Sequence, residues 1–378
     1  MNLNNEYMFT SESVTCGHPD KICDQISDAV LDAYLRQDPD SRVACEVCAN
    51  NKKVMVMGEI TSKANINVEE IVRNTIKKIG YNKTFMYDPE TIEVDICLNT
   101  QSPDISMGVN KEDIGAGDQG MMFGYATNET ETFLPYTVYY ANMLSKRLEE
   151  VRKENIIPYL GPDGKSQVTC HFKDNKLVNI DAIVISTQHT DIDIELLRKD
   201  IKEHVIDYCI PKELLNNTKI FINPTGRFIV GGPVGDSGLT GRKIIVDTYG
   251  GVIPHGGGAF SGKDYTKVDR TAAYYSRYVC KNLVAAGVCD KIMLQVAYAI
   301  GVSKPLSIYI DTYNTNKIEI NKIYEIIDKV FDFTPNNMIK ELDSKNMKYS
   351  DTTCYCHFGK NNLSYEQLNK VQEIKSYL

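Results

Sequence analysis

Residues 19–61 read PDKICDQISDAVLDAYLRQDPDSRVACEVCANNKKVMVMGEIT, and this stretch decides the predicted fold. Apolar residues recur at helical spacing from 22 to 33, which predicts a helix that Pro39 follows. Pro19 suits the first helical position, so His18 is the expected N-cap. The free backbone N–H groups at such a helix start attract anions.

A β-hairpin is predicted directly after this helix. RVACEVCA (42–49) and KVMVMGEIT (53–61) alternate like strands on either side of the turn residues 50–52. A second helix should then begin after Asn67, a good N-cap residue, and end at Gly80. The unit is therefore helix, hairpin, helix.

Acidic residues recur every four positions along the first helix, at Asp20, Asp24, Asp28 and Asp32. They form an acidic stripe on one helix face. For most of the stripe we expect a solvated surface. Asp20 is the exception, because it lies in the first turn beside His18.

The helix–hairpin–helix unit returns twice in the chain. The predicted hairpins begin near 43, 167 and 291. The later units comprise helices over about 135–153, 193–208, 267–287 and 320–331, with strands over 167–172, 177–186, 291–302 and 306–313. This order predicts an α+β fold of three repeated domains, with one face of each sheet covered by helices.

The expected domain ranges are 1–101, 112–229 and 230–378. Between the first two lies residues 102–118, a polar stretch punctuated by glycine and lacking periodicity. A segment of this kind is typical of a mobile active-site loop.

Composition indicates a globular protein, with 42% hydrophobic and 24% charged residues among 378. The net charge of −8 argues against a general nucleic-acid binder. The first residues lack a signal-peptide pattern and no apolar run reaches membrane-spanning length, so a cytoplasmic protein without a membrane partner is expected. Eleven cysteines fit a reducing compartment.

The glycine-rich stretch 231–270 carries eleven of the 25 glycines, interspersed with lysines and arginines. Such loops aim backbone N–H groups and cations at phosphate, which predicts a polyphosphate site. A Walker A loop is excluded, because Asp264 stands where a hydroxyl residue must hold magnesium. An esterase is also excluded, because the chain lacks a Gly-x-Ser-x-Gly elbow.

Four motifs identify a family. GHPDK (17–21), GAGDQG (115–120), GRKIIVDTYGG (241–251) and GGGAFSGKDYTKVDR (256–270) closely resemble S-adenosylmethionine synthetase, also called methionine adenosyltransferase. The likeness spans nearly the whole chain. Shorter matching segments are FTSESV (9–14), RVACE (42–46), KSQVT (165–169) and FINPTGRF (221–228).

The resemblance implies a three-domain architecture with pseudo-threefold symmetry. It also implies a reaction in which the sulfur of L-methionine attacks C5′ of ATP and displaces triphosphate, which is then hydrolysed to pyrophosphate and phosphate. Two Mg²⁺ ions per site and K⁺ would be the cofactors. The family builds its active site between two subunits, so a homodimer or homotetramer is implied.

Site residues carry over by matching motif. The resemblance implies catalytic roles for His18, Lys165, Arg242 and Lys263. The ATP contacts would be His18, Asp163, Lys165, Arg227, Phe228, Asp236, Arg242, Lys243, Ala259 and Lys263. Methionine would be bound by Glu59, Gln101, Asp118, Asp236 and Lys267. Asp20 and Asp269 would hold magnesium, and Glu46 would hold potassium.

Other readings of these residues stay open at this point. The same loops could serve an ATP-dependent phosphotransferase or ATPase, or a regulatory module that only binds triphosphate. His18 could be a helix cap alone, Glu46 an edge charge, and Phe228 a core residue. Cys16 departs from the family, which usually has Glu there; this either changes magnesium affinity or exposes a thiol.

Overall fold

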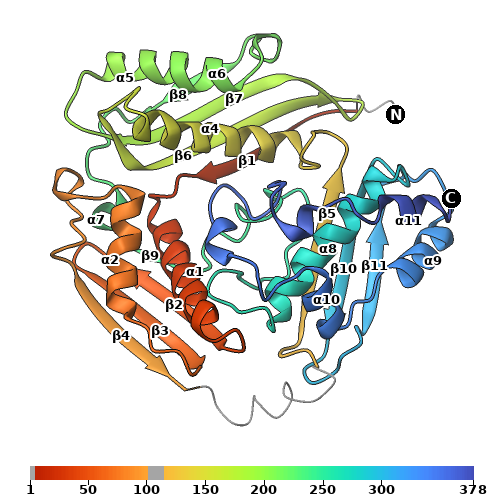
Figure 1. Cartoon of the computed structure of the whole chain (residues 1–378). Helices are drawn as coiled ribbons and strands as arrows, with labels where there is room; N and C mark the ends of the chain where they lie inside the picture. Colours follow the sequence, from red (N-terminus) through yellow and green to blue (C-terminus); the bar gives the residue numbers. More distant parts are fainter. Residues whose placement is uncertain (1–4, 101–114) are drawn as a thin grey trace.

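The computed structural model describes residues 5–100 and 115–378 and consists of three lobes (Figure 1). Each lobe has one β-sheet packed against helices, as the sequence predicts. The sheets have the strand orders β4-β3-β2-β9, β1-β6-β7-β8 and β11-β10-β5. Three separate clusters of buried apolar side chains fill the spaces between helices and sheets.

The first lobe contains the unit from which the fold was predicted. Its elements are α1 (Pro19–Gln37), β2 (Arg42–Ala49), β3 (Lys53–Thr61), α2 (Val68–Ile79), a 3-10 turn (Lys83–Phe85) and β4 (Glu93–Asn99). His18 caps α1 through its side chain. Asn67 accepts from the Glu70 N–H at 3.2 Å, and Gly80 ends α2 at φ +108°. The predicted caps are therefore confirmed.

The other two lobes repeat this order. The central one contains α4 (Tyr136–Lys153), β6 (Leu160–Lys173), β7 (Lys176–His189), α5 (Ile194–Ile201), a short π-helix (Lys202–Ile206), α6 (Asp207–Cys209), a 3-10 turn (Lys212–Leu214) and β8 (Lys219–Ile222). The third contains α8 (Val268–Ala285), β10 (Lys291–Tyr298), β11 (Ser307–Asp311), α9 (Ile320–Val330), α10 (Pro335–Glu341), 3-10 turns (Tyr349–Asp351, Ser364–Glu366) and α11 (Val371–Lys375).

Each sheet receives one strand from outside its own repeat. The strands before the first helices are β1 (Glu6–Val14), β5 (Gly120–Thr127) and β9 (Gly238–Leu239), and α7 (Gly232–Gly235) precedes β9. β1 joins the central sheet beside β6, β5 joins the third sheet beside β10, and β9 joins the first sheet beside β2. All three pairings are antiparallel. The first repeat gives its strand to the central sheet, the central repeat to the third sheet, and the third repeat to the first sheet, so the exchange of strands is cyclic. The predicted domain boundaries stay a prediction, because each sheet draws on two of those ranges.

Among the described residues, the helices lie against one face of each sheet (Figure 1). On β2, Val43, Cys45 and Val47 are buried, whereas Glu46 between them is exposed. This alternation assigns the buried face to α1 and the other face to solvent in the single chain. Among the helices of residues 5–100 and 115–378, none is long and apolar enough to cross a membrane.

Candidate active site

The acidic stripe of α1 faces the loops of the glycine-rich stretch, not solvent. Asp20, Asp24 and Asp28 are at most 3% exposed. Each stripe carboxylate accepts hydrogen bonds from backbone N–H groups more than 200 residues away. The donors are Leu239 to Asp20 (3.0 Å), Gly241 to Asp24 (2.8 Å), Gly262 to Asp28 (2.9 Å), and Tyr349 and Ser350 to Asp32 (2.7 and 3.0 Å). The expectation of a solvated surface was therefore wrong, because these tertiary donors replace water around the carboxylates.

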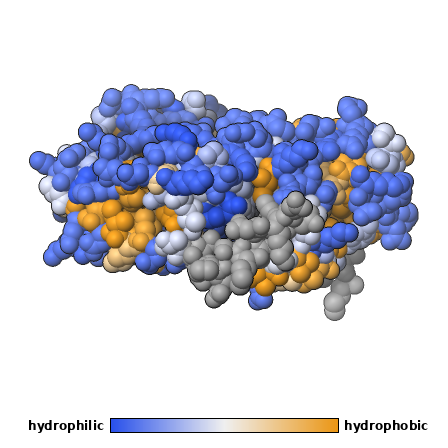
Figure 2. Space-filling view, turned by 60° about the horizontal axis from the view of Figure 1, so that its bottom comes forward, coloured by the Kyte–Doolittle hydropathy of each residue, from blue (hydrophilic) through white to orange (hydrophobic). Residues whose placement is uncertain are grey.

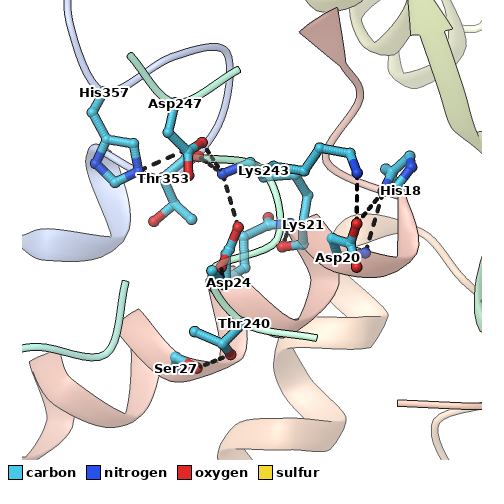
Figure 3. Close-up of polar contacts among 12 residues, drawn as sticks. His18, Asp20, Lys21, Asp24, Ser27, Thr240, Lys243, Asp247, Thr353 and His357 are labelled. Atoms are coloured by element: carbon cyan, nitrogen blue, oxygen red, sulfur yellow. Dashed lines mark hydrogen bonds and ion pairs between the residues drawn. The ribbon is translucent and has the colours of Figure 1, made fainter. Parts of the chain in front are cut away.

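The start of α1 brings three predicted site residues together (Figure 3). His18 Nδ1 accepts from the backbone N–H of Asp20 at 3.2 Å. The Asp20 carboxylate lies 2.6 Å from Nζ of Lys243. Burial, with Lys243 and Lys165 nearby, lowers the pKa of His18 to about 3. The imidazole is thus neutral at pH 7, and since Nδ1 accepts, Nε2–H is a hydrogen-bond donor.

Asp20 is ionised despite its position. Burial alone would raise the pKa of its carboxyl, but the hydrogen bonds from Lys243 and from the Leu239 N–H outweigh burial, so the pKa is lowered. A buried carboxylate that already has a cation beside it can exchange that cation for a metal ion.

A second lysine–carboxylate pair joins the next loop to the first turn of α8. Lys263 Nζ is 2.5 Å from Asp269, and the two side chains are 25% and 20% exposed. A methyl group built on Gly258 would stand 2.4 Å from Asp269 Oδ1, so backbone passes directly over this carboxylate. Ala259 similarly approaches Gly241. The two predicted polyphosphate loops are therefore in contact with each other.

The edge of β2 holds both loops. β9 pairs with Cys48 and Ala49, while Lys263 forms a bridge with Ala44. Ala44 also lies opposite Glu59 of β3. Because directly opposed residues have side chains on the same sheet face, Lys263 and Glu59 share the face that carries Glu46.

Asp163 lies on β6 in a buried pocket of polar groups. Its Oδ2 accepts from the Gly232 N–H at 2.8 Å, whereas Oδ1 has no hydrogen-bond partner in the part of the chain that the structure describes. Burial raises the pKa of this carboxyl to about 6, against the effects of Gly232 and Lys165. Gln188 links the pocket to Ile229, beside the half-buried Phe228.

Several predicted contact residues lie on the surface of the single chain. Lys165, Arg227, Asp236, Arg242, Glu46, Glu59 and Asp118 are exposed. Lys267 pairs with Asp264 at 2.6 Å. Gln101, and residues 102–114 of the predicted loop, lie outside the described residues.

Sequence reasoning missed a buried network beneath these loops. Lys21 Nζ contacts Asp247, lies 2.9 Å from Asp24, and donates to the Thr353 carbonyl at 3.0 Å (Figure 3). Burial opposes the charge on Lys21, but the two carboxylates raise its pKa. The signal was present in the helical spacing of Lys21 and Asp24, although their partners are distant in sequence.

Cys16 precedes α1, and its side chain is buried, with 8% of the residue exposed. Its Sγ lies 3.4 Å from the Tyr355 hydroxyl. Burial raises the pKa of the thiol, with Cys354 and Glu149 as further causes. The alternative of an exposed thiol is therefore wrong, and what distinguishes this position is a neutral group where the family usually has a carboxylate.

The site carboxylates fit an open magnesium site better than a closed site made only of protein ligands. Among residues 5–100 and 115–378, no group of three or more His, Cys, Asp or Glu side chains could hold a metal ion. Mg²⁺ is commonly bound through one or two carboxylates together with substrate phosphates and water. Asp20 and Asp269, each beside a lysine, provide such single carboxylates next to cations suited to phosphate.

Comparison with known proteins agrees with this geometry. The chain matches the N-terminal, central and C-terminal domains of S-adenosylmethionine synthetase over residues 6–103, 113–228 and 230–367. S-adenosylmethionine synthases of Clostridium tetani and Clostridium botulinum are 57% and 55% identical, each over 98% of this chain and 99% of the relative. That of Finegoldia magna is 53% identical over 98% of both chains. The chain belongs to the S-adenosylmethionine synthetase family.

Proposed function

We propose that this chain is a methionine adenosyltransferase that forms S-adenosylmethionine from ATP and L-methionine. The observation that carries the proposal is the pair of lysine–carboxylate contacts, Asp20–Lys243 and Lys263–Asp269, on touching loops. Both pairs are partly open. When polyphosphate and metal arrive, each lysine can turn to phosphate and each carboxylate to the metal.

The proposed reaction forms a bond between the methionine sulfur and C5′ and breaks the bond from C5′ to oxygen. The electron pair leaves with triphosphate, which is then hydrolysed to pyrophosphate and phosphate. A thioether needs no general base, so the enzyme has to align sulfur with carbon and stabilise the growing negative charge. His18, neutral and with Nε2–H as a donor, would contact the departing oxygen.

Cations on several elements would bind the leaving triphosphate. Lys165, Arg242, Lys243 and Lys263 supply charge, and arginine adds a bidentate fork. The unpaired Oδ1 of Asp163 supports a contact between this residue and the nucleoside. Phe228, half-buried, would line the same nucleotide pocket with Arg227, Asp236 and Ala259.

Asp20 and Asp269 would each hold one of two Mg²⁺ ions, and Glu46 would hold K⁺. Bound magnesium would supply further positive charge for the leaving triphosphate. Methionine would be held by Glu59, Gln101, Asp118, Asp236 and Lys267.

A second copy of the chain would complete the site as a homodimer, and dimers could pair into a homotetramer. Supporting this, Glu46 and Glu59 are exposed on their sheet face in residues 5–100 and 115–378. Exposed apolar side chains lie at its edge and on the third sheet, at Leu239, Met121 and Tyr309. Figure 2 shows apolar surface gathered in patches between polar regions. We place the enzyme in the cytoplasm, which the free cysteines among the described residues support.

Product analysis tests the activity. Incubation with ATP and Mg²⁺, with and without L-methionine, should give S-adenosylmethionine, pyrophosphate and phosphate only when methionine is present. A phosphotransferase or ATPase would leave ADP instead, and a binding module would leave ATP intact. Either of these results would overturn the proposal.

A further inference from the structure

We propose that Asp24 and Asp28 of the acidic stripe are positioning residues that set the two polyphosphate loops through backbone hydrogen bonds. The inference rests on the proposed function, because it concerns how Arg242, Lys243 and Lys263 are aimed. Asp24 and Asp28 are themselves fully buried, so they act on phosphate only through the loops they hold.

Asp24 fixes the start of the loop that carries Arg242 and Lys243. Its Oδ1 accepts from the Gly241 N–H at 2.8 Å, directly before these cations. Gly241 has φ +79°, a conformation that a side chain would strain. On the far side of the cations, the Asp247 N–H donates to the Lys243 carbonyl at 2.8 Å.

Lys21 ties both sides of that loop to α1. It contacts Asp24 and Asp247 at once, so one buried cation links the stripe to the residues before and after Arg242 and Lys243 (Figure 3). The loop is therefore clamped at Gly241 and at Asp247. Within the clamped loop, the Arg242 side chain is exposed and that of Lys243 pairs with Asp20.

Asp28 does the same for the segment 262–270, which carries Lys263 on its loop and Asp269 in the first turn of α8. Its Oδ1 accepts from the Gly262 N–H at 2.9 Å, directly before Lys263. Its two oxygens also bind the Arg270 guanidinium at 2.7 and 3.0 Å, directly after Asp269. A methyl group on Gly262 would meet the Cys45 carbonyl at 1.9 Å, so the approach is tight. One carboxylate thus holds both ends of the segment.

The distance between the two loops follows from the helix. Residues four apart on a helix lie on one face about one turn apart. Asp24 and Asp28 therefore space Gly241 and Gly262 along α1, and with them the cations that grip one polyphosphate chain. Loss of either carboxylate should let one loop drift, and misplacement by about 1 Å is enough to weaken a site strongly.

Asp32 provides a matched control on the same stripe. Its carboxylate accepts from the Tyr349 and Ser350 N–H groups at 2.7 and 3.0 Å, which is contact of the same kind. The segment it holds carries none of the predicted polyphosphate residues. A role limited to joining α1 to the third lobe would make Asp24 and Asp32 equivalent.

The test measures binding of inorganic tripolyphosphate in the presence of Mg²⁺ by calorimetry, with full-length Asp24→Ala, Asp32→Ala and wild-type protein. Asp24→Ala should fold, since Lys21 keeps Asp247 and the Thr353 carbonyl. We expect its affinity to fall about tenfold or more. Asp32→Ala should lose thermal stability yet bind tripolyphosphate as the wild type does. Asp24→Asn, which keeps an oxygen acceptor for the Gly241 N–H, should recover part of the affinity.

Equal losses of affinity in Asp24→Ala and Asp32→Ala, or wild-type affinity in Asp24→Ala, would overturn the inference. For Asp28 the test variant is Asp28→Asn, which keeps one oxygen acceptor and the volume beside Arg270 but loses the charged contact with the guanidinium. Its affinity should fall in part, as in Asp24→Asn, and wild-type affinity in that variant would remove Asp28 from the proposal. Failure of the proposed function is a separate result. In that case wild-type protein would make no S-adenosylmethionine, while the tripolyphosphate comparison would still distinguish the variants.

Discussion

Cations around α1 fall into two groups that differ in exposure. Lys243 and Lys263, paired with Asp20 and Asp269, have side chains that are 17% and 25% exposed. Lys21 and Arg270, bound to other carboxylates of the same helix, are at most 1% exposed. The open lysines can exchange a carboxylate for phosphate at little cost, whereas a buried cation cannot leave without stranding a charge. The two kinds of ion pair thus separate binding of phosphate from support of the loops.

The largest effect should come from breaking a buried pair. Arg270→Met leaves Asp28 without its guanidinium in a site of 0% exposure, and should lower the free energy of unfolding by about 3–5 kcal/mol. Urea unfolding followed by circular dichroism measures this loss. As a control, Lys345→Met removes the exposed pair with Asp40 and should cost less than about 1 kcal/mol. Equal stabilities of the two variants would abolish the distinction between the groups.

Loss of a partly exposed lysine should change turnover much more than stability. Lys263→Met should reduce turnover about 100-fold or more, because it removes a charge that stabilises the leaving triphosphate. The urea midpoint should move little, since the pair with Asp269 is partly solvated. Steady-state product formation and urea unfolding of the same preparation give both numbers. Near-normal turnover would contradict the assigned role.

A buried carboxylate without a paired cation should make the stability of the protein depend on pH. The pKa of Asp163 in the folded chain, about 6, lies above the ordinary value of 3.8. Its contribution to stability is therefore fully present below about pH 4 and is lost as pH rises through about 6. Asp163→Asn removes this loss. The free energy of unfolding of the variant, relative to that of the wild type, should therefore rise by about 2 kcal/mol between pH 4 and 7.5.

Urea unfolding at both pH values tests this sign. A constant difference between Asp163→Asn and wild type would show that the carboxyl titrates in its usual range. The variant should also bind ATP less tightly, because the amide cannot reproduce a carboxylate at the unused Oδ1 position.

The smallest effect should be on metal dependence. Asp20→Asn should raise the Mg²⁺ concentration for half-maximal rate about tenfold and leave the methionine requirement unchanged, since a hard cation prefers a carboxylate to an amide. Rates measured across a magnesium series at fixed ATP and methionine provide the test. Lower methionine affinity with normal magnesium dependence would reassign Asp20.

Much of the local structure could be predicted because its signals are local. His18 and Pro19 start α1, Asn67 and Gly80 bound α2, and alternation marks β2 and β3. β1 and β9 could not be assigned to their sheets, because their partner strands lie in other repeats and no sequence pattern in either strand indicates which sheet it joins.

The site was predictable in part for the same reason. Motifs group residues by sequence, and the structure brings Lys243 to Asp20 and Lys263 to Asp269. The acidic stripe was misjudged, because periodicity assigns charges to solvent unless the partners are known. The partners of Asp24 and Asp28 are backbone N–H groups of Gly241 and Gly262, which no sequence pattern reveals.

The cyclic exchange of strands has a consequence for synthesis on the ribosome. Ala49 of the first sheet pairs with Gly238, and Glu6 pairs with Lys173. At ordinary elongation rates, the nascent first lobe waits on the order of ten seconds for its last strand to emerge. Until then the edge of β2 is unprotected, and edges of this kind pair readily with other chains. The order of translation therefore makes the N-terminal lobe, although first to be made, close only after the central lobe, whose last strand ends at Ile222.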